Sequence, residues 1–130
     1  MSIVQASDAT LPDDLASRSV CYLTTTGRIS GKAHEIEIWF AARGGALYIL
    51  SGGRDRSDWV KNVKREPRVS IRFDGQTFAG TAEIIEGADE DLIARQTVVA
   101  KYYGWRDGPL PNAWARDSLP VAIRLSPITD

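Results

Sequence analysis

Six short segments carry the apolar patterns of β-strands, and they constrain the fold more than any other feature of this sequence. Apolar and polar residues alternate in most of them, which places every second side chain on a shared face of a strand. Asp74-Gly75 separates two of these segments and is a strong signal for a two-residue hairpin turn, which joins antiparallel strands. The pattern therefore predicts an antiparallel sheet. Its segments are 20–25, 35–40, 46–50, 69–73, 76–86 and 121–125.

Two longer segments have the helical period instead. One follows Gly53 and is stopped by Pro67, and the other covers residues 88–103, whose apolar positions lie on one stripe. Residues 112–117 have room for one or two further helical turns. We therefore predict a mainly β fold, a small barrel of about six antiparallel strands with two main helices packed against it.

The bulk properties narrow the range of functions. A chain of 130 residues fits one domain, so we expect residues 1–130 to share one core. No stretch approaches the ~20 apolar residues of a membrane span, and the N-terminus lacks the pattern of a signal peptide. Cys21 is the only cysteine, which allows a reducing compartment, and we expect a cytoplasmic protein. A net charge of −1 gives no support for nucleic-acid binding.

The segment Ser51–Arg72 concentrates positive charge where a strand, a glycine pair and a helix start follow one another. Seven Lys or Arg stand against three acids between residues 54 and 72. The free N–H groups at a helix start favour an anion, and basic side chains strengthen that preference. A surface helix with a solvated basic face is the alternative reading. The loop Thr24–Lys32 offers hydroxyls, glycines and cations as well, so two such loops together suggest a phosphorylated ligand.

These motifs resemble those of the deazaflavin-dependent nitroreductase family. The resemblance rests on Thr25-Thr26-Gly27-Arg28 with Ser30-Gly31-Lys32, then Leu50-Ser51-Gly52-Gly53-Arg54, then Trp59 with Asn62-Val63, and Glu66-Pro67. That family belongs to the split-barrel flavin-binding superfamily, which also contains pyridoxamine 5'-phosphate oxidase. The resemblance implies a split β-barrel that binds the deazaflavin coenzyme F420. It also implies hydride transfer between the reduced cofactor and a small organic acceptor, an enone, a quinone or a nitroaromatic.

The resemblance also assigns roles to residues. Arg28 and Lys32 would face the phosphate or the acidic tail of F420, and Tyr102 or Tyr103 is the candidate proton donor. A turn and a helix would complete the site. The cofactor-binding residues implied in this way are Arg28, Lys32, Ser51, Gly52, Gly53, Arg54, Trp59, Lys61 and Asn62.

Other readings stay open at this stage. Superfamily relatives use FMN, or hold lipid or haem without catalysis, and the fold alone does not choose among these ligands. Trp59 shares a helical stripe with Val63, so it is equally a candidate core anchor. His34 is more typical of a surface residue than of a ligand, and one His with one Cys cannot assemble the usual zinc sets. We expect a homodimer, because split barrels often pair.

Overall fold

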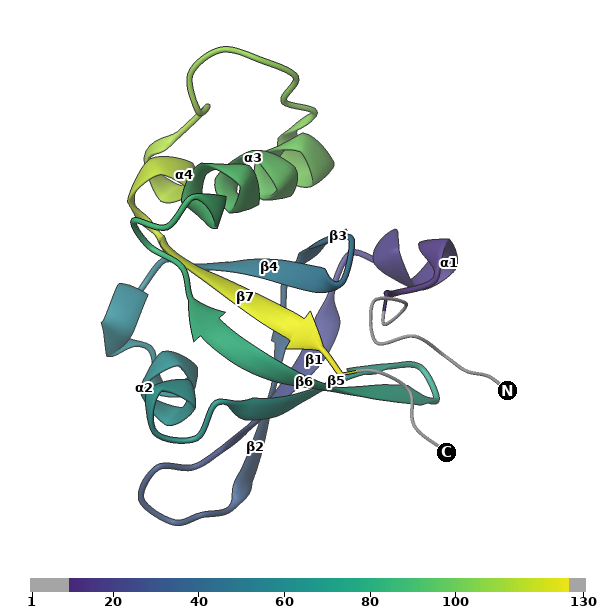
Figure 1. The fold of residues 1–130 in the computed structure, drawn as a ribbon, viewed down its shortest axis with the longest axis vertical. Coiled ribbons are helices and arrows are strands. Elements are labelled where there is room, and N and C mark those ends of the chain that lie inside the picture. The colour runs from purple at the N-terminus through teal and green to yellow at the C-terminus, as the bar shows by residue number, and fades with distance from the viewer. Residues whose placement is uncertain (1–9, 127–130) are drawn as a thin grey trace.

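Seven strands form one antiparallel sheet in the computed structural model, which describes residues 10–126 (Figure 1). Their order across the sheet is β2-β1-β5-β6-β7-β4-β3. The strands are β1 (Cys21–Thr26), β2 (Ala33–Ile38), β3 (Ala41–Arg43), β4 (Ala46–Ser51), β5 (Arg68–Phe73), β6 (Gln76–Ile84) and β7 (Leu119–Leu125). The predicted mainly β, antiparallel architecture is confirmed.

The sheet curls on itself because its two edge strands are consecutive in the chain. β2 and β3 are separated only by Trp39 and Phe40, yet they lie at opposite ends of the strand order. The sequence predicts a single strand over 35–40, whereas β2 ends at Ile38. Phe40 is fully buried, and its backbone N–H and carbonyl bond to the Tyr102 hydroxyl rather than to a neighbouring strand. This bend creates the short seventh strand, β3.

Within residues 10–126, four α-helices and one 3-10 turn accompany the sheet. In Figure 1, α3 and α4 lie together at one end of the curled sheet, and α2 lies against another side of it. None of the helices within residues 10–126 has the length and apolar character that crossing a membrane requires. The elements are α1 (Asp13–Ala16), η2 (Arg54–Arg56), α2 (Asp58–Arg65), α3 (Glu90–Tyr103) and α4 (Ala113–Asp117).

Two apolar clusters, one on each face of the central strands, form the core. The larger fills the inside of the curl around Leu23, Ile49 and Ile71. The smaller lies between the sheet and α3, around Leu50 and Val98. Every residue of β4 is therefore buried, which explains why its sequence is a continuous run of apolar and aromatic residues up to Leu50 instead of alternating.

A charged network ties the start of α3 to the sheet. The Tyr48 hydroxyl donates to Glu90 Oε2 at 2.5 Å, and Arg124 donates to both Glu90 oxygens at 2.8 and 2.5 Å. The Arg124 hydrogen bonds, followed by that of Tyr48, lower the pKa of Glu90 to about 2. The ionised carboxylate is thus part of what holds α3 in place.

We expect Glu90→Gln to lower the free energy of unfolding by about 1–2 kcal/mol at pH 7, because it removes a charge-assisted, partly buried hydrogen-bond acceptor. The folded pKa lies below the ordinary value of 4.5. The contribution of Glu90 is therefore full above about pH 4.5 and is lost as the pH falls toward 2. Urea unfolding of both proteins across this range measures the difference, which should shrink with falling pH.

Glu83→Gln is the matched control, since Glu83 also accepts from Arg124 but its side chain is 59% exposed, against 29% for Glu90. A pH-independent gap between the Glu90→Gln variant and the unmodified protein would contradict this account.

Candidate functional site

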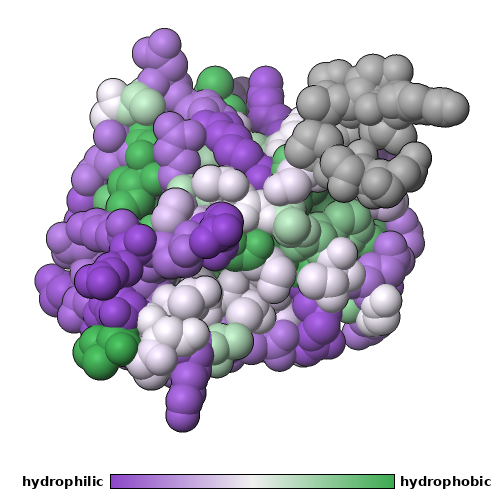
Figure 2. All heavy atoms as spheres, turned by 60° about the horizontal axis from the view of Figure 1, so that its bottom comes forward, coloured by the Kyte–Doolittle hydropathy of each residue, from purple (hydrophilic) through white to green (hydrophobic). Residues whose placement is uncertain are grey.

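A cavity of about 610 Å³ opens between the β1–β2 loop, the first half of β2 and the start of α2. Its volume is within the range typical of small-molecule sites. Figure 2 shows hydrophilic side chains gathered on the side of the molecule where α2 lies, with smaller hydrophobic areas among them. The lining residues are Thr25, Gly27, Arg28, Ile29, Ser30, Ala33, His34, Glu35, Ile36, Asp58, Trp59 and Asn62.

The loop that forms one wall is a tight turn closed by its own backbone. The Gly27 N–H donates to the Lys32 carbonyl at 2.7 Å, and the Gly31 N–H donates to the Gly27 carbonyl at 2.9 Å. Gly31 has a φ of 73°, a left-handed conformation that favours glycine. The two glycines of the motif therefore shape the turn that carries Arg28 into the cavity.

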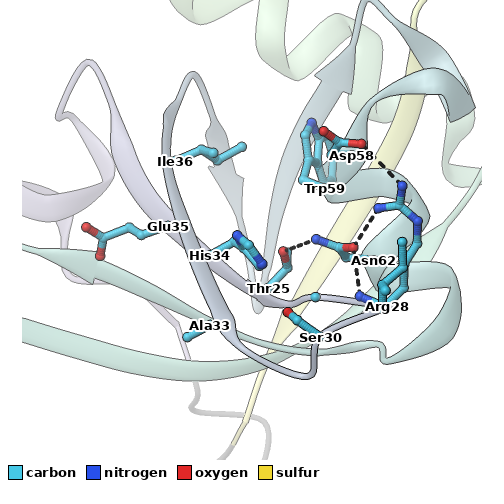
Figure 3. A pocket seen from close by; sticks show the side chains of 12 residues that line it. Thr25, Arg28, Ser30, Ala33, His34, Glu35, Ile36, Asp58, Trp59 and Asn62 are labelled. Atoms are coloured by element: carbon cyan, nitrogen blue, oxygen red, sulfur yellow. Dashed lines mark hydrogen bonds and ion pairs between the residues drawn. The ribbon is translucent and has the colours of Figure 1, made fainter.

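The buried side chain of Asn62 joins this loop to α2. Its amide nitrogen donates to Thr25 Oγ1 at 3.0 Å, and its Oδ1 accepts from the Arg28 backbone N–H at 3.1 Å and from the Arg28 guanidinium at 3.0 Å (Figure 3). Thr25 and Asn62 are both buried. Three hydrogen bonds on one amide fix the position of Arg28 relative to the helix.

The guanidinium of Arg28 also meets an acid. Its Nη2 donates to Asp58 Oδ1 at 3.4 Å, on the side away from Asn62. The Arg28 side chain is 29% exposed and that of Asp58 is 85% exposed. The cation is thus held from two sides and still reaches solvent inside the cavity.

The apolar part of the cavity comes from α2 and β2. Trp59 lines the cavity and also packs against the larger core cluster, so it anchors the core and presents part of its surface to the cavity. Ile36 and His34 project from β2 on the opposite wall (Figure 3). The imidazole lies so close to Gly27 that a Cβ there would sit 2.7 Å from His34 Nε2. His34 is therefore part of the cavity wall.

The turn Ser51–Arg54 lies outside this lining, and its polar groups have partners within the fold. The Ser51 hydroxyl is 3.0 Å from the Arg54 carbonyl and 2.9 Å from Ser57 Oγ. The Arg54 guanidinium donates to the Asp117 carbonyl at 2.6 Å and to the Glu86 carboxylate. Gly52 and Gly53 complete the turn, which links β4 and β7 to the start of α2.

The remaining predicted site residues also lie outside the lining. Lys32 and Lys61 are exposed. On α3, Tyr102 stacks on Trp39 with ring centroids 4.3 Å apart, and its hydroxyl bonds to the backbone of Phe40, while burial raises its pKa. Tyr103 is half exposed. The structure thus brings Arg28, Trp59 and Asn62 together in one cavity and leaves the other predicted residues outside it.

Several lining residues have no place among the predicted site residues. Thr25 stands within the quoted motif, but its hydroxyl is directed to Asn62, 37 residues away in sequence, and no local pattern indicates that contact. An acid is common in the first turn of a helix, so the sequence pattern explains Asp58 without indicating its contact with Arg28. Ile36 follows the strand period and was assigned only to the sheet.

The curled antiparallel sheet, with consecutive strands at its two edges, agrees with the predicted split-barrel fold. Residues 1–125 match the family model described as F420H(2)-dependent quinone reductase, and the chain belongs to this family. It is therefore an F420-dependent oxidoreductase. The predicted enzyme class, cofactor and family resemblance are confirmed.

Solved structures agree with the fold. A conserved hypothetical protein from Mycobacterium tuberculosis is 22% identical, with a TM-score of 0.71 over 93% of this chain and 84% of that chain. An F420-H2 dependent reductase, FDR-A, is 25% identical, with a TM-score of 0.60 over 82% of this chain and 94% of that one. A pyridoxamine 5'-phosphate oxidase-like protein from Listeria innocua is 18% identical, with a TM-score of 0.57 over 88% of each chain.

The donor set of the cavity fits F420, which combines a planar ring system with a phosphate and an acidic tail. Arg28 supplies a guanidinium for an anionic oxygen, and Ser30 supplies a hydroxyl beside it. Trp59 and Ile36 supply apolar surface for a planar ring. Asp58 and Glu35 are the two lining residues whose charge opposes an anion.

We expect Thr25→Val to lower the free energy of unfolding by about 1–2 kcal/mol, because it leaves the buried Asn62 amide nitrogen without its acceptor. Thr25→Ser keeps the hydroxyl and should retain most of that stability. Urea unfolding of the two variants measures the difference. Equal stability of the two variants would show that this hydrogen bond contributes nothing.

Proposed function

We propose that this oxidoreductase transfers a hydride from reduced F420 to a quinone. The family description supports a quinone as the acceptor. The observation that carries the proposal is the guanidinium of Arg28, fixed by Asn62 and placed in the same cavity as Trp59. A fixed cation beside an aromatic side chain suits a ligand with an anionic group and a planar ring.

The residues of the chain bind and orient the cofactor. When bound, F420 supplies the hydride, so the protein needs no nucleophile of its own. We propose that Arg28 contacts the phosphate or the tail, and that Trp59 and Ile36 contact the ring system. Asn62 holds Arg28 in position, so the geometry of the cation is set before the ligand arrives.

Two lysines at the surface have a place in this proposal. Lys32 follows the β1–β2 loop, and Lys61 lies on α2, so both elements that carry them also line the cavity. Exposed ammonium groups suit a flexible, acidic tail, because they bind without a fixed geometry. The turn Ser51–Arg54 would then contribute by positioning the start of α2.

Tyr102 and Tyr103 remain candidates for supplying a proton to the reduced acceptor. The raised pKa of Tyr102 makes its hydroxyl a weaker acid, and that hydroxyl is occupied by the backbone of Phe40. Tyr103 is the more accessible of the two. Tyr103 is thus the freer hydroxyl of the two, although both lie outside the cavity in which we place F420.

We also propose a homodimer in the cytoplasm. Pairing of split barrels buries part of a sheet face, and a single buried cysteine fits a reducing compartment. Light scattering of the purified protein measures its mass directly.

We expect Arg28→Gln to weaken F420 binding roughly ten-fold or more, since a charge-assisted hydrogen bond contributes about 1.5–3 kcal/mol. Titration of F420 followed by tryptophan fluorescence measures the dissociation constant, and Trp59 gives the signal. Arg106→Gln removes the same charge from an exposed loop and should leave affinity unchanged. If both substitutions change the affinity for F420 equally, the cofactor does not bind at Arg28.

The acceptor is tested by following the oxidation of reduced F420 with menadione, a nitroaromatic and a cyclic enone under the same conditions. We expect the highest kcat/KM with the quinone. If kcat/KM is higher with the nitroaromatic, the quinone is not the preferred acceptor. The assignment of the cofactor would not be affected by that result.

A further inference from the structure

The cation of the candidate site has an acidic partner inside the same cavity. Arg28 divides its guanidinium between Asn62 at 3.0 Å and Asp58 at 3.4 Å. The two contacts differ in kind, since Asn62 is neutral and Asp58 carries a negative charge. The neutral amide adds no repulsion to an incoming anion, whereas the Asp58 carboxylate weakens the binding of a second anion to Arg28, because like charges around one guanidinium repel each other.

Asp58 faces Arg28, whereas the other acidic residue of the lining does not. Glu35 accepts two hydrogen bonds of 3.0 Å from Arg72, and its side chain points away from Arg28 (Figure 3). The Asp58 carboxylate lies beside the Arg28 guanidinium and Trp59 in the same view. It is therefore the charge that a ligand's anionic group meets when it approaches Arg28.

A helix-start role does not account for this placement. An acid in the first turn of α2 stabilises the helix wherever its carboxylate points, because the helix dipole acts on the whole first turn. The Asp58 carboxylate instead points toward the β1–β2 loop, and its Oδ1 lies within ion-pair distance of Arg28. At 85% exposure the carboxylate can rotate into solvent without losing a buried contact.

We propose that Asp58 sets the affinity and selectivity of the site by competing with the anionic part of F420 for Arg28. The inference rests on the proposed placement of F420. Without ligand, Asp58 neutralises Arg28, so a weak anion gains little by displacing it. A ligand with several negative charges and a ring that contacts Trp59 displaces the carboxylate more readily. Asp58 thus discriminates against small anions such as inorganic phosphate.

Isothermal titration of F420 into Asp58→Asn, Arg28→Gln and the double variant tests this mechanism. Asp58→Asn should bind F420 about two- to five-fold more tightly at low salt, the range expected for removing an exposed competing charge. In the Arg28→Gln background the same substitution should give little gain, because no guanidinium remains to be released. The decisive quantity is thus the difference between the affinity change that Asp58→Asn causes in the unmodified protein and the change it causes in Arg28→Gln.

Asp55→Asn is the matched control. Asp55 pairs with Lys64 at 3.6 Å and does not line the cavity, so it removes one negative charge near α2 without touching Arg28. An equal gain in F420 affinity from Asp55→Asn would show that the effect comes from net charge alone. An equal gain from Asp58→Asn in the unmodified and Arg28→Gln backgrounds would show the same, and either result would overturn the proposal.

A second titration with inorganic phosphate alone tests the selectivity. We expect measurable phosphate binding to Asp58→Asn and at least three-fold weaker binding to the unmodified protein. Equal phosphate affinity of the two proteins would overturn the claim about small anions. Failure of the unmodified protein to bind F420 would instead overturn the placement of the cofactor, whereas normal binding with no change in Asp58→Asn would overturn the role of Asp58 alone.

Discussion

The buried amide of Asn62 is the interaction on which the candidate site depends. It bonds to the end of β1 through Thr25 and to the following loop through Arg28, so it fixes α2 against the barrel. Without these partners the buried amide would destabilise the fold, because no hydrogen bond would offset its removal from water. The fold therefore favours this one arrangement of α2, the loop and β1. The same three contacts hold the wall of the cavity and place its cation, so fold and binding site share one network.

Sequence patterns predicted the elements of the fold because each strand obeys a local rule. The strand patterns correspond to β1, β5 and β6, whereas the helix expected directly after the glycine pair is divided into the 3-10 turn η2 and α2, which begins at Asp58. The bend at Trp39 and Phe40 escaped prediction, since its cause is non-local. The backbone of Phe40 bonds to Tyr102, which lies 62 residues away. Only the packing of α3 on the sheet makes that bond possible.

The same distinction between local and distant contacts applies to the site. Arg28, Trp59 and Asn62 stand in motifs whose resemblance to a known family implied a common site, and the structure places all three in one cavity. Arg54 belongs to an equally suggestive motif, yet its partners are Glu86 and Asp117, 32 and 63 residues along the chain. A basic residue beside a glycine pair looks the same in the sequence whether it meets a ligand or another part of the fold.

Electrostatic balance within the cavity explains how a protein with a net charge of −1 can accommodate an anionic cofactor. Positive charge is concentrated on the β1–β2 loop and on α2, and Asp58 at the start of α2 offsets part of it. Arg28 and Asp58 form the clearest such pair, with both side chains in contact with solvent. A cation that is partly neutralised in the free protein favours ligands that bring several interactions at once, which is what a deazaflavin with a charged tail offers.

The central claim is that Arg28, Asn62 and Trp59 surround the cofactor. Nitrogen-15 NMR of side chains tests it most directly, because the Asn62 amide, the Arg28 guanidinium and the four tryptophan indoles give separate signals. Addition of F420 should shift the signals of Arg28, Asn62 and Trp59 most strongly. Shifts centred on Arg54 and on Trp114, whose indole lies beside Gly52, with those three signals unchanged, would contradict the account and move the site to the turn after β4.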